Sequence, residues 1–251
     1  MAAPSSRLRA GIVVVVLASL AAIAATYFLF FRGDSPPPLQ LSTPEPTTGA
    51  TSGASPTTAA AQAAGAPEGG VTGRWSVGQG STVGYRVREK LARLPAQNDA
   101  VGRTTAVTGA IEVGQRGSDL VVAAGSRFEA DVTQLTSDEP QRDNRIRTQG
   151  LQSNQFPTAT FVATAPVTLP AAAAEGASPV KAEATGDLTI HGVTKRVTIP
   201  LDAQLTGARI EVVGSLRFPF SDFGMSPPNI AGFVTVDEEA TLEFQLFFDK
   251  Q

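Results

Sequence analysis

The chain contains no cysteine and only one histidine, His191. Without cysteine it has no disulfide bonds, no cysteine-ligated metal and no thiol nucleophile. A single histidine with no cluster of carboxylates beside it does not supply the three or four converging ligands of a zinc or iron centre. No G-x-S-x-G elbow occurs in the sequence either. We therefore predict no catalytic residue, no metal site and no enzymatic activity.

Strong charge of either sign is also missing. Lysine and arginine number 20 against 23 aspartates and glutamates, which gives a net charge of -3, and the basic residues are scattered along the chain. A protein that binds nucleic acid usually carries a basic patch or stripe. The sequence therefore predicts no nucleic-acid partner, and it gives no indication of the oligomeric state.

One long apolar run lies near the N-terminus. Residues 11–31 contain no charged side chain, and a helix of that length crosses the roughly 30 Å hydrocarbon core of a bilayer. The run continues to Phe31 with no small-residue cleavage site after it, so we favour an uncleaved transmembrane anchor over a cleaved signal peptide.

The charges beside this run predict its orientation. Arg7 and Arg9 precede it, whereas Arg32 behind it is offset by Asp34. By the positive-inside rule, residues 1–10 are predicted to be cytoplasmic. The protein is then a single-pass protein of the cell membrane, with its C-terminal domain on the periplasmic or cell-envelope side.

Residues 32–73 consist mainly of proline, threonine, alanine, serine and glycine. Such a segment buries too little apolar surface to offset its chain entropy, and we predict a disordered linker. As a coil of roughly forty residues it spans about 35 Å on average. We favour a passive spacer; the alternative is a tether that lets the domain reach the membrane or cross part of a cell wall.

Residues 74–251 form one predicted domain in which apolar residues recur at every second position. This alternation is typical of strands with one buried face. The stretches that follow it are 83–87, 107–113, 120–130, 158–165, 180–190, 197–205, 210–218 and 241–248. Residues 138–155 break the alternation and predict a short helical excursion. About eight antiparallel strands form either a closed barrel or a two-layer sandwich, and periodicity does not separate the two.

The hairpin over residues 180–205 carries a recognisable motif. Its turn region, 186–195, reads GDLTIHGVTK and resembles the signature of the YceI-like polyisoprenoid-binding family. Residues 141–161, QRDNRIRTQGLQSNQFPTATF, resemble a second family block, and 221–225, SDFGM, resemble a third. The sequence departs from the family at Phe220, where arginine is common, and at Glu89 and Lys90, where many members have histidine. The resemblance covers roughly residues 74–250.

The resemblance implies an all-β, lipocalin-like eight-stranded antiparallel barrel that binds, sequesters or transports an amphiphilic isoprenoid lipid, polyprenyl or quinone-like. No other cofactor is expected. The predicted ligand-binding residues face inward or lie in the loop 223–230: Phe128, Phe161, Leu188, Ile190, Ile199, Leu216, Phe218, Phe223, Met225 and Phe244. The loops 90–102 and 223–230 are predicted to form the mouth. The alternative is a cell-envelope interaction or scaffold module with a filled barrel and no ligand.

Two further sets of residues bear on this choice. Small residues are predicted on the inner face and favour an unfilled interior: Gly109, Ala124, Ala182, Ala184, Gly186, Ala203 and Gly214. The polar residues His191, Arg142 and Asp143 are expected to stabilise a turn and to brace the excursion. For His191, a hydrogen bond to a lipid head group is the other role considered.

Overall fold

We describe a computed structural model, in which residues 35–42, 70–91, 97–176, 178–230 and 234–251 are placed. The chain divides into two compact units, residues 1–36 and 37–251. The predicted cytoplasmic segment 1–10 and anchor 11–31 lie outside the described residues, as does most of the predicted linker. Within the residues that are placed, we find no helix long and apolar enough to cross a membrane.

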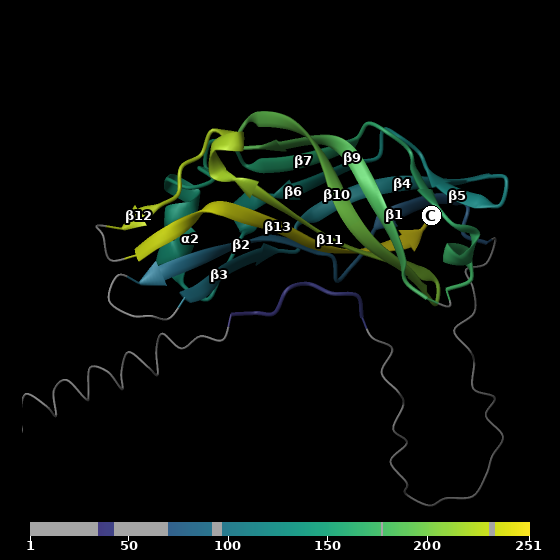
Figure 1. The fold of residues 1–251 in the computed structure, drawn as a ribbon, viewed down its shortest axis with the longest axis horizontal. Helices are drawn as coiled ribbons and strands as arrows, with labels where there is room; N and C mark the ends of the chain where they lie inside the picture. The colour runs from purple at the N-terminus through teal and green to yellow at the C-terminus, as the bar shows by residue number, and fades with distance from the viewer. Residues whose placement is uncertain (1–34, 43–69, 92–96, 177, 231–233) are drawn as a thin grey trace, which may run out of the picture. The chain divides into compact units, whose positions relative to one another are not determined.

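Eight antiparallel strands close into a barrel in the order β13-β11-β10-β9-β7-β6-β4-β1, with β1 pairing back onto β13 (Figure 1). Their bounds are β1 Gly73–Val77, β4 Val107–Arg116, β6 Arg127–Asp131, β7 Thr158–Ala163, β9 Val180–Ile190, β10 Val193–Thr206, β11 Arg209–Pro219 and β13 Val234–Lys250. The predicted eight-stranded antiparallel barrel is confirmed, and the sandwich alternative is wrong because the ring of strand pairs closes.

The strand that closes the ring was not among the predicted stretches. In β1, Trp75 pairs with Lys250 of β13 and with Ile111 of β4. Its indole is fully buried and donates from Nε1 to the carbonyl of Val71 at 2.8 Å. The strand is five residues long, which is too short for its alternation to stand out in the sequence.

Further strands extend the ring at both ends. They are β2 Thr82–Leu91, β3 Gln97–Thr104, β5 Asp119–Val122, β8 Val167–Leu169 and β12 Asn229–Ile230. Strand β2 pairs with residues 234–245 of β13, whereas β1 pairs with residues 248–250 of the same strand. The other edge of β2 pairs with β3. The predicted mouth loop 90–102 is thus mostly strand, because β2 and β3 form a hairpin there.

The predicted strand 120–130 is two strands, β5 and β6. Between them Gly125 has a positive φ of 86°, and the Ser126 hydroxyl donates to the carbonyl of Ala123 at 2.9 Å, which fixes a bend. Ala124 is exposed in this bend, so its predicted inward position is wrong.

The β9–β10 hairpin turns in two residues. His191 and Gly192 both have positive φ, 52° and 74°, as a type I′ turn requires, and Val193 pairs with Ile190. The turn is tighter than the predicted 191–195 because Val193 to Lys195 already belong to β10.

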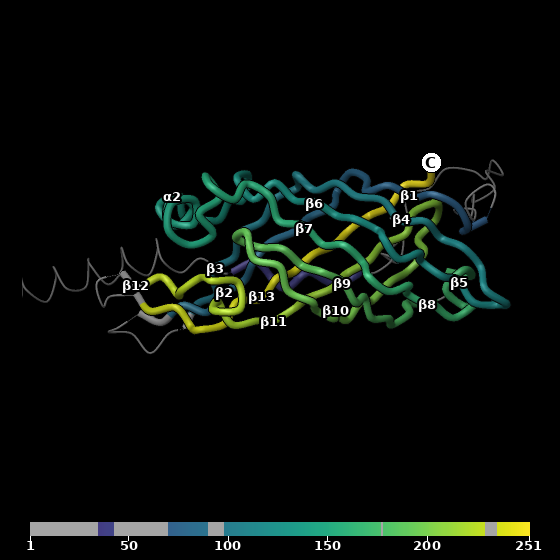
Figure 2. The backbone as a smooth tube through the Cα atoms, turned by 90° about the horizontal axis from the view of Figure 1, so that it is seen from above, coloured from purple at the N-terminus to yellow at the C-terminus, as the bar shows by residue number. Residues whose placement is uncertain are grey.

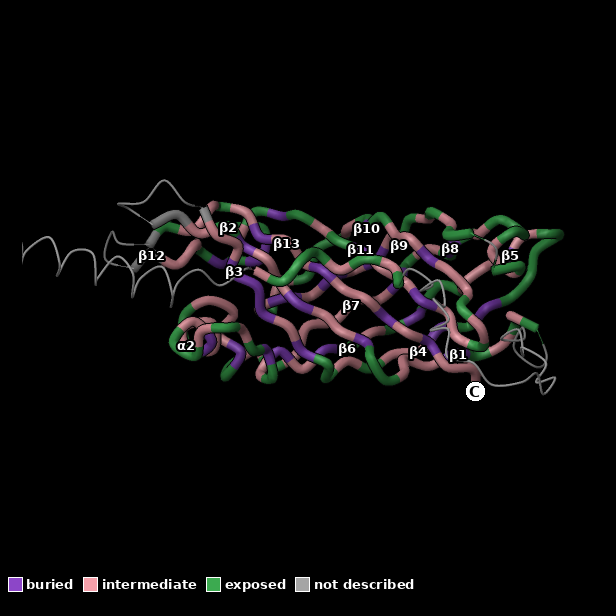
Figure 3. Tube along the Cα trace, turned by 90° about the horizontal axis from the view of Figure 1, so that it is seen from below, coloured by how far each residue is buried: buried purple, intermediate pink, exposed green. Residues whose placement is uncertain are grey.

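The predicted helical excursion is confirmed by α2, Pro140–Thr148. Pro140 occupies the first turn, where its missing N–H is not needed, and the Glu139 carboxylate accepts from the amide of Gln141. The shorter helices are η1 Val132–Gln134, η2 Ala171–Ala174 and η3 Phe220–Phe223. Figures 1 and 2 place α2 and β12 at one end of the barrel and β5 and the C-terminus at the other; we call these the α2 end and the β5 end. Exposed residues gather on the turns around β5 and β8 (Figure 3).

Candidate functional site

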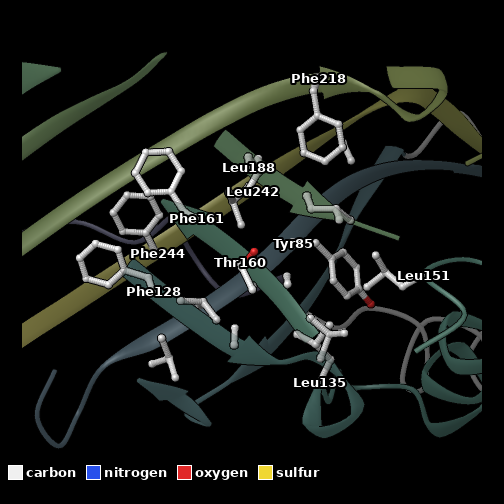
Figure 4. A pocket seen from close by; sticks show the side chains of 18 of the residues that line it. Tyr85, Phe128, Leu135, Leu151, Thr160, Phe161, Leu188, Phe218, Leu242 and Phe244 are labelled. Carbon is white, nitrogen blue, oxygen red and sulfur yellow. The ribbon is translucent and has the colours of Figure 1, made fainter. Parts of the chain in front are cut away.

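The interior of the barrel encloses an apolar cavity of about 230 Å³ toward the α2 end. Of the predicted ligand-binding residues, the following line it: Phe128, Phe161, Leu188, Ile190, Ile199, Phe218, Met225 and Phe244 (Figure 4). They come from neighbouring strands and the 223–230 loop, so the barrel brings together residues far apart in sequence. That any of them contacts a ligand stays a prediction.

Two predicted residues do not line the cavity. Phe223 is 1% exposed and packs edge-on against Phe218, with ring centroids 4.9 Å apart. Leu216 is half-buried and packs against the same hydrophobic cluster. Both therefore pack in the hydrophobic cluster that contains Phe218 without bordering the cavity.

Sequence reasoning missed the residues that cover the α2 end. Leu135, Ile146 and Leu151 reach the cavity from the excursion between β6 and β7, and Tyr85 reaches it from β2. Tyr85 shares the alternation of Val83 and Val87 and was open to prediction. The other three lie in an irregular segment whose periodicity gives no inward face.

Three phenylalanine rings lie flat against the wall, each over a glycine of a neighbouring strand. A Cβ atom built on Gly109, Gly186 or Gly214 would lie 2.4 Å from the ring of Phe128, Phe161 or Phe244, respectively. The same three rings stand close together in Figure 4. The glycines therefore do not leave the void that the sequence predicted at their own positions; they give each ring room to lie along the wall.

A second apolar cavity, of about 110 Å³, lies toward the β5 end. Four residues line both cavities: Phe128, Ala184, Leu201 and Val212. The two spaces therefore lie next to each other in the barrel, on either side of these shared side chains. The predicted small inward residue Ala184 does border open volume, unlike the three glycines.

Tyr85 brings a buried phenol to the cavity wall. Its hydroxyl is buried and has no hydrogen-bond partner among the described residues. Burial raises the pKa of the Tyr85 phenol above its ordinary value, and the nearby Arg142 only partly opposes this. The group is thus a neutral hydroxyl. Its oxygen is not exposed to the cavity, whose lining surface is apolar throughout, so the ring must turn before the hydroxyl can meet a molecule there.

The charged residues near the cavity are engaged with one another. Arg142 donates to Glu89 at 3.3 and 3.2 Å and pairs with Asp138. The buried Asp143 accepts from the amide and hydroxyl of Ser137 at 3.0 and 2.6 Å. As predicted, Arg142 and Asp143 brace the excursion. None of the described residues that line the cavity is lysine, arginine or histidine, so its wall offers no cation to an anionic group.

His191 fixes the hairpin to the 223–230 loop. Its Nδ1 lies 3.2 Å from the carbonyl oxygen of Phe223, and its ring packs against Phe156 with centroids 4.5 Å apart. This is the turn-stabilising role expected from the sequence. The part of the chain that the structure describes contains no group of three or more metal-ligating side chains.

Comparison with known proteins places this architecture in a family. A model of the YceI-like domain matches residues 76–248. A UPF0312 protein of Vibrio parahaemolyticus is 32% identical over 116 residues, 43% of this chain and 56% of the relative; one of Vibrio vulnificus is 28% identical over 126 residues, 47% and 61%. The chain thus spans less than two thirds of the curated relatives it matches.

A solved structure of low sequence identity shares the fold. A polyisoprenoid-binding domain from Saccharophagus degradans superposes with a TM-score of 0.52 at 17% identity, covering 72% of this chain and all of that domain. BcnA of Burkholderia cenocepacia gives a TM-score of 0.48 at 23% identity, covering 66% of this chain and 95% of BcnA.

Proposed function

Because the chain belongs to the YceI-like family, we propose that its barrel binds the apolar tail of an amphiphilic isoprenoid lipid and sequesters or carries it without reacting with it. The observation that carries the proposal is the apolar cavity between the three phenylalanine rings on the wall and the residues that cover its α2 end. The Saccharophagus degradans domain of the same fold is described as polyisoprenoid-binding, which supports the choice of lipid.

The cavity volume limits the length of tail that fits. An apolar cavity of about 150 Å³ holds one benzene molecule in another protein. On that scale the cavity of about 230 Å³ takes roughly nine carbons, about two isoprene units. The second cavity adds room for roughly four more carbons. A longer tail requires the rings of Phe128, Phe161 and Phe244 to swing away from the wall or the tail to leave through an end.

The lining favours a neutral head group. A phosphate buried here would have no lysine or arginine beside it among the described lining residues, and an unpaired buried charge is strongly unfavourable. A turn of the Tyr85 ring would instead present a neutral hydroxyl, which suits a quinone carbonyl or a polyprenol hydroxyl. Between these two head groups the geometry has no preference.

We further propose that the domain works beside a bilayer, anchored through residues 11–31 and facing the periplasm or cell envelope. At about 0.8 kcal/mol per methylene, a polyprenyl tail of several tens of carbons costs on the order of 20 kcal/mol or more in water. Transfer between two apolar environments is close to balanced, so a barrel near the lipid source exchanges ligand reversibly.

Denaturing extraction of the purified full chain followed by mass spectrometry tests the proposal. The protein is purified from the membranes of the cells that express it and is washed until unbound lipid is removed. It should then release one apolar isoprenoid per chain. A protein that purifies empty and takes up none from quinone-containing vesicles contradicts the carrier and leaves the filled scaffold module as the function.

A further inference from the structure

A short segment of the chain N-terminal to the barrel lies on the outer face of the barrel. We call residues 37–42 the strap; they have no regular secondary structure and belong to the same compact unit as the strands (Figure 1, purple). Barrel side chains donate hydrogen bonds to its carbonyls: Arg103 to Pro37 at 2.6 Å, Gln245 to Gln40 at 3.1 Å and Gln204 to Ser42 at 3.0 Å.

These contacts follow the order of the strands. Arg103 belongs to β3, Gln245 to β13 and Gln204 to β10, and the sheet runs β3-β2-β13-β11-β10. Four strand spacings of about 4.8 Å amount to about 19 Å. An extended chain from residue 37 to 42 spans about 17 Å, and the long Arg and Gln side chains cover the difference. The strap therefore crosses five neighbouring strands.

Two carboxylates under the strap show that this face is built to be covered. Glu211 and Glu243 are on the outward side of β11 and β13, yet they are 1% and 3% exposed. Glu211 accepts from the amide and hydroxyl of Ser42 at 2.9 and 3.1 Å and from Gln204 and Gln245 at 2.6 Å each. A carboxylate is stable in such a place only when hydrogen bonds replace its water, and the strap supplies two of them.

Glu243 extends this arrangement to the other end of the strap. It accepts from Arg103 at 2.9 and 2.7 Å and from Arg86 at 3.3 Å. Arg103 thus joins a buried carboxylate to the carbonyl of Pro37.

The composition of the strap suits this surface. Pro37 and Pro38 have no backbone N–H, so only their carbonyls need partners, and their fixed φ keeps the free segment extended. A stiff segment loses less entropy when it docks. Burial alone would raise the pKa of the Glu211 carboxyl, but hydrogen bonds from Gln245, Gln204 and Ser42 lower the pKa below its ordinary value, so the strap amide meets a charged carboxylate.

We propose that this outer face is a docking surface for the chain's own strap and that docking sets the distance between the barrel and the membrane. The consequence for the tether rests on the anchor at residues 11–31 proposed above. With the strap docked, only residues 32–36 connect the anchor to the barrel surface and reach about 18 Å at most. With the strap released, roughly forty residues separate them by about 35 Å on average.

The shorter tether concentrates the barrel at the lipid source. The effective concentration of a tethered partner falls roughly as the −3/2 power of tether length. Shortening the tether from roughly forty residues to five therefore raises the local concentration at the bilayer about 20-fold. The docked strap thus favours exchange of ligand with the bilayer, and the released strap allows the barrel to reach farther.

Energy transfer in liposomes tests the proposal on the full chain. The absence of native cysteine lets a single Ser118→Cys, at the exposed β4–β5 turn, carry a dye whose transfer to a lipid-bound acceptor reports the distance. Ser42→Pro removes both the amide and the hydroxyl that donate hydrogen bonds to Glu211. Ser42→Ala keeps the amide and is the matched control. Circular dichroism checks that both variants keep the sheet.

We expect lower transfer for Ser42→Pro than for the parent and nearly unchanged transfer for Ser42→Ala. Equal transfer in all three proteins overturns the role of the strap in setting the distance. A chain that does not associate with liposomes contradicts the proposed anchor. In that case exchange of the Ser42 amide decides alone: slow exchange supports docking, and exchange at the rate of a free chain overturns it.

Discussion

Ala184→Phe should close the candidate site without unfolding the barrel. Ala184 is 8% exposed and lines both interior cavities, so an added phenyl ring projects into open volume. Such a ring needs about 150 Å³ of cavity and leaves well under half of the 230 Å³ space. A tail then loses contact for roughly six carbons, on the order of 5 kcal/mol of apolar burial, so we expect affinity for a short-tailed ligand to fall by up to about four thousandfold.

Calorimetric titration with a quinone that carries two isoprene units measures this loss, because so short a ligand stays soluble. Thermal unfolding measures whether the barrel stays folded. If the new ring fills a void, the free energy of unfolding should rise or should fall by no more than about 1 kcal/mol. Thr198→Phe, on the exposed outer face of β10, is the matched control and should bind normally. Unchanged binding by Ala184→Phe refutes an interior site. Destabilisation beyond about 3 kcal/mol refutes the void, since it is the result expected of overpacking.

Three further predictions concern single groups. Tyr85→Phe removes a buried hydroxyl that has no hydrogen-bond partner among the described residues. It should leave the free energy of unfolding unchanged or raise it by about 1 kcal/mol, and it should weaken quinone binding several-fold. Equal quinone binding by the parent and the variant would exclude the phenol as a head-group contact. The lowered pKa of Glu211 means that its contribution to stability is complete above its ordinary pKa of 4.5 and is lost as pH falls through the folded-state pKa; thermal melts should show this acid loss, and Glu211→Gln should flatten it. Glu89→Gln weakens the ion pair that joins β2 to Arg142 and should lower the free energy of unfolding by about 1 kcal/mol. If the ligand leaves past the excursion at the α2 end, the same change should also speed ligand release in stopped-flow. An unchanged release rate would mean that the ligand does not leave by this route.

The ring of strands could be predicted wherever alternation ran over seven residues or more. Strands β9, β10, β11 and β13 each have a buried face that follows the pleat, and their residues fall where the period of two puts them. The short strand β1 and the bend at Ala124 escaped prediction because backbone conformation, not hydrophobicity, decides them. Glu211 lies on the outward side of β11, and the strap that helps to bury it could not be predicted because no sequence pattern links residues 37–42 to β11.

The wall of the site was predictable and its cover was not. Phe161, Leu188 and Phe244 reach the cavity because alternation fixes their direction. Leu135 and Leu151 reach it from a segment with no regular period, so their direction depends on tertiary contacts such as the Arg142 to Glu89 pair that ties the excursion to β2. Inward direction was also not enough: Leu216 shares the register of Phe218 and packs on the hydrophobic cluster, yet it does not border the cavity.

The pairing of glycine with phenylalanine explains how an aromatic barrel keeps an open interior. A large inward ring normally fills a small barrel, yet Phe128, Phe161 and Phe244 each lie over the bare backbone of a glycine and so occupy the wall instead of the axis. A methyl group at Gly214 would meet the Phe244 ring at 2.4 Å, which no packed structure tolerates, and the ring would have to turn inward. The lumen is therefore maintained by the absence of three Cβ atoms, and an apolar tail that enters it meets the faces of three rings.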